Sequence, residues 1–430
     1  MNISFPYGTD YQTYDIPESR YAGTLLSRMH EVHPAQTPQE LVEEAFRHPI
    51  GTKPLRELAA GKQNIVILAS DHTRPVPSRL IMPPMLRELR SGSRDAKITI
   101  LIATGCHRTT TKDELRAKFG DAIVDSETIC IHDCDDEENL VELGTLPSGG
   151  TLRLNRLAAE ADLLVAEGFI EPHFFAGFSG GRKSVLPGIA ARKTVIYNHN
   201  AAFIADPCAR TGILEGNPIH RDMLFAAKAA KLAFICNVVL DSDKNPVFAV
   251  CGDAELAHLE GCRYLRERCA VKAVPSDIVI TTNGGYPLDQ NIYQAVKGMT
   301  AAEATVRPGG VIIMLARSND GHGGESFHRT FRDQPDLSRM MEDFLRTPAE
   351  ETIIDQWQSQ IFARVLLRAS VIYISDAPDV LVRELHMLPA HSIGQAVSMA
   401  DALLAERGIR NGSILAIPDG VSVIVEEESV

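Results

Sequence analysis

The 430-residue sequence contains no run of about 20 apolar residues, the length that a helix needs to cross a bilayer. Residues 1–10 also lack the basic stretch followed by an apolar stretch that marks a secretory signal. These absences argue against a membrane partner and a secreted protein. We therefore expect a cytoplasmic protein.

Positive charge is in short supply. The chain has 43 Lys and Arg against 56 Asp and Glu, for a net charge of −13. An acidic surface argues against nucleic acid or an anionic membrane as a partner, because both require a basic surface. An anionic substrate must then be attracted by a few local cations within the binding site.

Cysteine is scarce and dispersed, and several of the eight thiols stand in apolar runs. This pattern predicts reduced, partly buried thiols. Cys130, His132 and Cys134 alternate along one segment, so they could face one way in a strand. No fourth ligand is evident nearby, which disfavours a metal site there. The positions are Cys106, Cys130, Cys134, Cys208, Cys236, Cys251, Cys262 and Cys269.

Short β-branched runs alternate with helical patterns along the chain. Continuous apolar runs of this kind predict parallel strands covered by helices on both faces, so the fold class is α/β with mostly parallel, Rossmann-like sheets. The helix 392–406 and the strand 414–417 close the pattern. The expected strands are 64–70, 97–103, 162–166, 233–240, 277–282, 310–316 and 370–374.

The length predicts two or three domains, and a break is expected in residues 268–276, after a helix over 254–268. We therefore expect two domains, 1–270 and 271–430, with the active site in a cleft between them. In open parallel sheets, ligands bind where strands end and helices begin. The unusual residues of this chain follow the predicted strands.

Residues 174–184 read Phe-Phe-Ala-Gly-Phe-Ser-Gly-Gly-Arg-Lys-Ser. The segment nearly matches a phosphate-binding P-loop, but Arg182 stands where the second glycine belongs, so a nucleotide triphosphatase is disfavoured. Lys183 is alternatively a nucleophile or covalent anchor, since the neighbouring Arg182 disfavours its ammonium form. A basic loop that binds any anion is the third interpretation.

His107 and His173 both follow predicted strands. Imidazole gives and takes protons near neutral pH, so the two side chains are candidates for general acid and base. His199, in Tyr-Asn-His-Asn, is a candidate metal ligand because neutral imidazole suits nickel, copper or zinc. Each of them could equally be an ordinary hydrogen-bonded histidine. His322, in Asp-Gly-His-Gly-Gly, has no assigned role.

Asp71 and Arg74 lie on a turn after the first strand. Arg74 is a candidate for binding a phosphate or carboxylate, and an Asp71–Arg74 ion pair is the alternative.

Residues 289–298 predict a short helix with Asp289 as its N-cap and Gly298 as its C-terminal stop. Gln294 and Lys297 are three residues apart and therefore share one face. This pair could bind a small carboxylate, or it could belong to a solvated helix face.

Four segments together resemble the lactate racemase family that uses a nickel-pincer nucleotide. They are residues 70–78, 103–108, 167–188 and 283–299, and the resemblance extends over nearly the whole chain. The cofactor that it implies is Ni(II) pyridinium-3,5-bisthiocarboxylic acid mononucleotide. The resemblance also implies partner proteins that make and insert this cofactor.

The resemblance implies a role for each candidate residue. Lys183 holds the cofactor covalently and His199 ligates the nickel. His107 and His173 form the acid/base pair. The remaining candidates surround the reactants: Asp71 and Arg74 in the cofactor and substrate pocket, and Gln294 and Lys297 at the substrate carboxylate.

The implied activity is interconversion of D- and L-lactate. Loss of the C2 hydrogen as a proton leaves a carbanion beside a carboxylate, whereas loss as hydride leaves a planar, pyruvate-like ketone. The second route requires an acceptor such as this cofactor, because no side chain accepts hydride. The alternatives are a racemase or epimerase of a larger 2-hydroxyacid, a phosphate-binding transferase, and a non-catalytic carrier of nickel or nucleotide.

Overall fold

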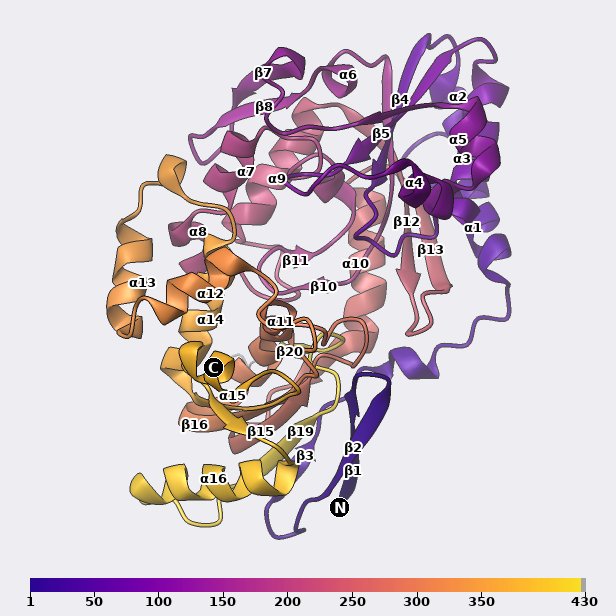
Figure 1. The fold of residues 1–430 in the computed structure, drawn as a ribbon. Coiled ribbons are helices and arrows are strands. Elements are labelled where there is room, and N and C mark those ends of the chain that lie inside the picture. The colour runs from indigo at the N-terminus through magenta and orange to yellow at the C-terminus, as the bar shows by residue number, and fades with distance from the viewer. Residues whose placement is uncertain (427–430) are drawn as a thin grey trace. The chain divides into compact units, whose positions relative to one another are not determined.

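The computed structural model describes residues 1–426, which form two compact units (Figure 1). The first unit is Arg28–Arg268. The second unit combines Met1–Ser27 with the chain from Cys269 onward. The break at residue 268 lies close to the expected one, but residues 1–27 belong to the second unit rather than to the N-terminal domain. The reason is strand pairing: β3 (Tyr21–Thr24) adds in parallel to β19 (Ile414–Ile417).

The first unit has a six-stranded sheet with the order β13-β12-β9-β4-β5-β6 among the described residues. All neighbouring strands are parallel except β12 and β13, which are antiparallel. The three central strands are β9 (Leu163–Phe169), β4 (Asn64–Ser70) and β5 (Lys97–Ala103). The predicted strands 64–70 and 97–103 are confirmed with both of their ends.

Helices cover both faces of this sheet. Phe46 of α1 (Pro38–Arg47) and Met82 of α3 (Ser78–Gly92) are buried against alternate residues of the strands, such as Ile67 and Ile100. On the other face, α9 (Pro218–Ala229) contacts β12 (Leu232–Leu240). The continuous apolar runs in the sequence reflect this burial from both sides.

The other elements of the first unit are mostly short. They are η1 (Arg28–Glu31), α2 (Leu55–Ala59), α4 (Lys112–Phe119), α5 (Asp121–Ser126), β6 (Thr128–Ile131), η2 (Glu137–Asn139), β7 (Leu140–Thr145), β8 (Thr151–Asn155), α6 (Arg156–Ala159), β10 (Pro172–His173), β11 (Gly177–Phe178), η3 (Gly181–Ser184), α7 (Arg192–Asn198), α8 (Ala201–Ala205), β13 (Pro246–Gly252) and α10 (Leu256–Cys269).

The second unit has a six-stranded sheet with the order β18-β17-β16-β15-β19-β3, and each neighbouring pair in its described part is parallel. Its central strands are β15 (Ser276–Thr282) and β16 (Val306–Leu315). The helix α16 (Ile393–Glu406) packs against β16 and β17 (Ser370–Ile374), while α11 (Ile292–Glu303) contacts β15 and β16. The α/β class with mostly parallel sheets is confirmed.

The remaining elements of the second unit complete its helical layers and edges. They are β1 (Asn2–Tyr7), β2 (Asp10–Asp15), β14 (Ala270–Lys272), α12 (Glu325–Arg332), α13 (Leu337–Arg346), η4 (Ala349–Glu351), α14 (Gln356–Arg368), α15 (Asp379–Glu384), β18 (Leu388–Ala390) and β20 (Ile424–Glu426).

The helix α11 differs from its sequence prediction at both ends. Its N-cap is Asn291, whose side chain accepts a hydrogen bond from the backbone N–H of Gln294, and not Asp289. Gly298 lies inside the helix and does not end it. A Cβ atom at Gly298 would stand 2.5 Å from the carbonyl oxygen of Thr282. The glycine therefore lets the helix approach the end of β15 closely.

No helix within residues 1–426 is long and apolar enough to cross a membrane.

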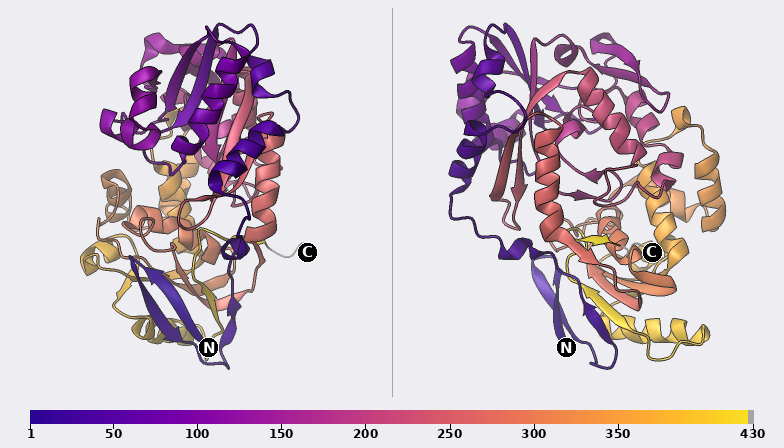
Figure 2. Two further views of the ribbon diagram at one scale, coloured as in Figure 1. Left: turned by 90° about the vertical axis from the view of Figure 1, so that its right-hand side faces the viewer. Right: turned by 180° about the vertical axis from the view of Figure 1, so that it is seen from behind.

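We predict that Phe5→Ala destabilises the second unit. Phe5 lies on the N-terminal β1–β2 hairpin, drawn in indigo beside the C-terminal strands of the same unit (Figure 2). Its side chain is fully buried in a cluster with Ile16, Ile280 and Ile313. Removing a buried phenyl ring typically lowers the free energy of unfolding by about 3–5 kcal/mol. Urea denaturation measures the loss, and Tyr11→Ala, at a side chain that is 69% exposed, is the control. Equal stability of both variants would contradict this assignment of residues 1–27.

Candidate active site

Three predicted site residues follow the three central strands of the first unit. Asp71 comes directly after β4, His107 four residues after β5, and His173 four residues after β9. Because β9, β4 and β5 are parallel neighbours, their carboxyl ends lie at one edge of the sheet. The structure therefore brings segments that are far apart in the sequence to the same edge.

Asp71 and His107 form a hydrogen-bonded pair. The Oδ2 atom of Asp71 lies 2.7 Å from Nδ1 of His107, while Oδ1 accepts a hydrogen bond of 2.6 Å from the Thr73 hydroxyl. Burial acts to raise the pKa of Asp71, but these hydrogen bonds outweigh burial and hold the pKa below its usual value. The carboxylate thus keeps a proton on Nδ1 of His107, which leaves the lone pair on Nε2.

Arg74 does not form the ion pair with Asp71 that the sequence left as an alternative, because Asp71 binds His107 instead. Its side chain is exposed, whereas Asp71 is buried and bound to His107. The charge of Arg74 lowers the pKa of Asp71 only as the weakest of the identified causes. Its carbonyl oxygen accepts a hydrogen bond of 3.3 Å from Nζ of Lys118. This exposed guanidinium can bind an anionic group.

Three predicted site residues lie around the ring of Phe175. His173 contacts its ring edge-on with centroids 4.5 Å apart, and His199 does so at 5.2 Å. The Nζ atom of Lys183 lies 5.6 Å from the centroid of the same ring and 3.2 Å from Nε2 of His173. The sequence did not single out Phe175, because the residue type of one aromatic side chain in a glycine-rich loop does not indicate which residues it contacts.

His199 is held in the neutral state that metal ligation requires. It caps the C-terminus of α7, and its Nδ1 donates a hydrogen bond of 3.0 Å to the Val195 carbonyl. Burial and the positive charge of Lys183 lower the pKa of His199 to about 3. Its lone pair is consequently on Nε2. A carbonyl that fixes the other ring nitrogen is the usual arrangement for a metal-binding histidine.

The side chain of Arg182 is buried and turns inward, so the P-loop interpretation is wrong. Its Nη2 donates to the Ala176 carbonyl at 2.7 Å, and its Nη1 donates to the Phe178 carbonyl at 2.8 Å. A P-loop instead directs backbone N–H groups at a phosphate, ahead of a helix. Here the carbonyls of the loop face a cation, and only the 3-10 turn η3 follows.

The half-buried imidazole of His220 and the buried imidazole of His258 complete the surroundings of Arg182. Its Nε donates to Nδ1 of His220 at 3.0 Å, and its Nη1 lies 3.0 Å from Nε2 of His258. Burial lowers the pKa of Arg182 to about 10, so the guanidinium stays charged at neutral pH. Burial and then the positive charge of Arg182 lower the pKa of His258 well below its usual value.

Gln294 and Lys297 both lie on α11 in the second unit. Their spacing places them on one face of this helix, and both side chains are half-buried.

His132 is a structural residue. Its Nε2 atom lies 3.1 Å from the Ala190 carbonyl, and its Nδ1 lies 3.2 Å from the Asn155 amide nitrogen. Both ring nitrogens are thus engaged within the protein.

Glu167 is a buried carboxyl group that sequence reasoning did not single out. It lies on β9, accepts a hydrogen bond of 2.6 Å from the Ser78 hydroxyl, and has its pKa raised by burial. Its position in an apolar strand was the available signal, since acidic residues are rarely buried without a specific partner.

We predict that the first unit loses stability as the pH falls below about 6.5, and that His258→Gln weakens this dependence. A histidine kept neutral by the fold takes up a proton only on unfolding, so its contribution is present above the ordinary pKa and lost below it. Each such residue contributes about 1.4 kcal/mol per pH unit. Urea denaturation between pH 6.5 and 5 measures the slope, with exposed His48→Gln as the control. An unchanged slope in His258→Gln would contradict the prediction.

Two family models match the chain. The lactate racemase N-terminal domain matches residues 7–212, and the lactate racemase C-terminal domain matches residues 271–425. A protein named lactate racemase from Thermoanaerobacterium thermosaccharolyticum is 52% identical over 428 residues, which is 99% of this chain and 100% of the relative. A lactate racemase from Lactiplantibacillus plantarum is also 52% identical, over 99% of each chain.

The fold agrees with these matches. The structure of the lactate racemase apoprotein from T. thermosaccharolyticum has a TM-score of 0.95 and covers 99% of this chain and 100% of that chain. A Thermotoga maritima protein has a TM-score of 0.63 at 18% identity, and this likeness shows the fold alone. The term apoprotein describes a protein without its cofactor. The chain therefore belongs to the lactate racemase family and is an isomerase of the racemase type.

Proposed function

We propose that the protein interconverts D- and L-lactate by reversible hydride transfer, with a nickel-pincer nucleotide attached to Lys183. The observation that carries the proposal is the grouping of Lys183, His173 and His199 around Phe175. The loop with His107 is linked to this group, because the Gly105 N–H donates a hydrogen bond of 2.9 Å to the Gly188 carbonyl.

The residues present fit this cofactor. Lys183 supplies a primary amine for a covalent bond, and the half-buried Nζ atom lies beside an imidazole. His199 supplies a neutral nitrogen with its lone pair on Nε2, a donor type that suits nickel. The exposed Arg74, on the turn that begins with Asp71, supplies positive charge for the anionic part of a nucleotide. When bound, this group supplies a reversible acceptor for hydride.

Side chains of the protein accept and return the proton of the substrate hydroxyl. His107 presents Nε2 as a base, since Asp71 holds the proton on Nδ1. Asp71 also stabilises the imidazolium that forms when His107 accepts a proton. We assign His173 as the corresponding group for the other enantiomer, through the Nε2 atom that faces Lys183. Racemisation needs two such groups, because the ketone takes back its hydrogen from the opposite face.

We propose that Gln294 and Lys297 bind the substrate carboxylate. An amide and an ammonium group, three residues apart on α11, can donate hydrogen bonds to the same carboxylate. Local cations are needed because the chain has a net charge of −13.

The proposal includes a cytoplasmic location and partner proteins that make and insert the cofactor. All eight cysteines are free thiols in the structure, which supports a reducing compartment. A larger 2-hydroxyacid is the alternative substrate, and a chiral assay with several hydroxyacids distinguishes it from lactate. The inward side chain of Arg182 argues against the phosphate-binding transferase.

We predict that the protein, produced together with cofactor-synthesis proteins, carries a nucleotide-sized adduct on Lys183 and contains nickel. Mass spectrometry of the intact protein and its peptides locates the adduct, and metal analysis measures the nickel. Lys183→Arg keeps the charge but cannot form the same bond, so it should lack both the adduct and the activity. Equilibration of pure L-lactate by unmodified, nickel-free protein would overturn the proposal, and metal binding without racemisation would indicate a carrier.

We predict that His107→Ala and His173→Ala each slow racemisation in both directions. A general acid or base typically contributes about 10²–10⁴-fold to the rate, and each direction uses both groups. Chiral chromatography from pure D- and pure L-lactate measures the two rates, and the adduct on Lys183 is quantified in each variant to separate chemistry from cofactor loading. His48→Ala, at an exposed side chain, is the control. Full activity of His173→Ala in either direction would refute its assignment.

A further inference from the structure

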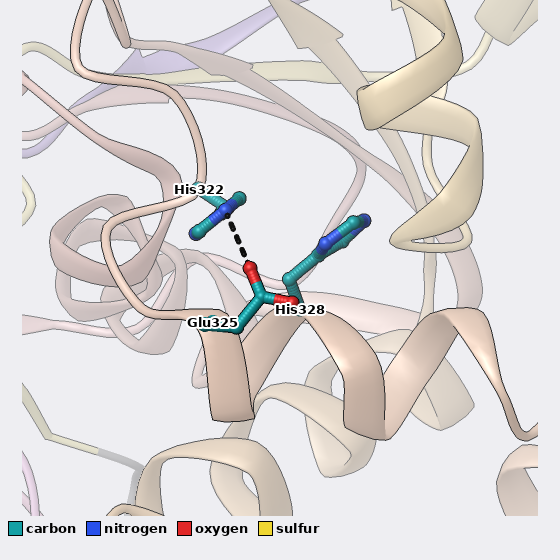
Figure 3. A group of neighbouring side chains, drawn as sticks. All are labelled: His322, Glu325 and His328. Atoms are coloured by element: carbon teal, nitrogen blue, oxygen red, sulfur yellow. Dashed lines mark ion pairs between the residues drawn. The ribbon is translucent and has the colours of Figure 1, made fainter.

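A cluster of two histidines and a glutamate, none of which has a role assigned above, lies in the second unit. His322 stands on the loop between β16 and α12, Glu325 is the first residue of α12, and His328 lies one turn further along this helix. Figure 3 shows the Glu325 carboxylate reaching toward His322, with the His328 imidazole on the same side of the helix. One potential ligand atom from each residue lies within 4.8 Å of the other two.

The side chains of this cluster lie close to one another. Nε2 of His322 lies 3.5 Å from a carboxylate oxygen of Glu325. The two imidazole rings are nearly parallel, with centroids 4.9 Å apart. His328 is buried, whereas the side chain of His322 is 31% exposed. An ion could therefore enter from the side of His322.

Glu384, the last residue of α15, orients His328. One of its carboxylate oxygens lies 2.7 Å from Nε2 of His328. A carboxylate at this position holds the proton on Nε2 and leaves the lone pair on Nδ1. Metal-binding histidines are commonly held in this way by an outer carboxylate, which also raises the basicity of the ligand nitrogen.

We infer that His322, Glu325 and His328 form a binding site for one divalent transition-metal ion, with Glu384 as the outer partner of His328. Two imidazole nitrogens and one carboxylate suit Zn²⁺, Ni²⁺ or Co²⁺, whereas Ca²⁺ and Mg²⁺ prefer oxygen ligands alone. The set provides three protein ligands, and water supplies the remaining position.

Binding requires one ring to turn. Parallel imidazoles cannot both point their lone pairs at one ion, and Nδ1 of His322 accepts a hydrogen bond of 3.0 Å from the Gly324 N–H. His322 is the ring that can move, because it lies between Gly321 and Gly323, whose φ angles are +70° and +79°. The buried His328 thus provides the fixed part of the site, and His322 and the exposed Glu325 complete it.

The loop with His322 also begins the helix α11. The Gly321 carbonyl accepts a hydrogen bond of 3.0 Å from the Ile292 N–H, and the His322 carbonyl accepts one of 3.1 Å from the Tyr293 N–H. An ion on His322 would thereby connect the first turn of α11 to α12. The consequence is that metal binding stiffens the segment that precedes Gln294.

A second group, Asp133, Cys134 and Asp135, has similar spacing but a different chemistry. Arg192 donates two hydrogen bonds to Asp135, of 2.7 and 2.6 Å. These two short bonds neutralise the carboxylate of Asp135, whereas Arg329 lies only within 3.8 Å of Glu325, and the second group contains no imidazole.

The test is titration of the full, chelator-treated chain with Zn²⁺ by calorimetry, and with Co²⁺ by visible absorption. His199→Gln is the background, because it removes the ligand proposed for nickel. We expect one bound ion per chain and a melting temperature that rises with Zn²⁺ concentration. His322→Gln and His328→Gln should each abolish this binding. Glu384→Gln should weaken it by about 10–100-fold, as is typical of outer partners.

The matched control is His391→Gln, at a histidine of the same unit whose side chain is 68% exposed, and it should bind Zn²⁺ like the background. His322→Gln keeps the inference testable if the buried His328 proves necessary for folding. The inference is overturned if the His199→Gln chain shows no saturable binding. It is also overturned if a folded His322→Gln chain binds Zn²⁺ with unchanged affinity.

Discussion

The buried guanidinium of Arg182 is the constraint on which the site of the first unit depends. It binds the carbonyls of Ala176 and Phe178 and two imidazoles, instead of the carboxylate that usually accompanies a buried cation. Without this cation, several buried carbonyl groups would lose their donors, each at a penalty of about 1–3 kcal/mol. The shape of the loop between His173 and Lys183 therefore depends on the contacts of one buried side chain.

The same loop holds three other candidate site residues close together: Lys183, His173 and Phe175. With the carbonyls turned inward, Lys183 and His173 meet at 3.2 Å, and Phe175 contacts both His173 and His199. A second device acts at the neighbouring strand end, where the buried Asp71 sets the protonation of His107. At this second position, a carboxylate taken out of water by the fold dictates which nitrogen of a more accessible imidazole carries the proton.

The sequence was sufficient for much of this description. The α/β class and most strands follow from apolar runs, because burial on both faces leaves a direct compositional trace in parallel strands. Long family-like strings also singled out Lys183, His107, His173 and His199, and the structure groups three of these around one ring. The interpretation of Asp289 as an N-cap failed because Asn291, two residues on, competes for the same role with the same kind of side chain.

What the sequence by itself determined is the class of fold, the family and the candidates for the reacting side chains, since these depend on local patterns and on residue types. Only the tertiary structure decided which residues and segments contact one another. It assigned residues 1–27 to the second unit by strand pairing, joined Asp71 to His107 instead of Arg74, and turned Arg182 inward. Such choices depend on which distant segments are buried together, and burial between segments far apart in the chain is not encoded in the spacing of either one.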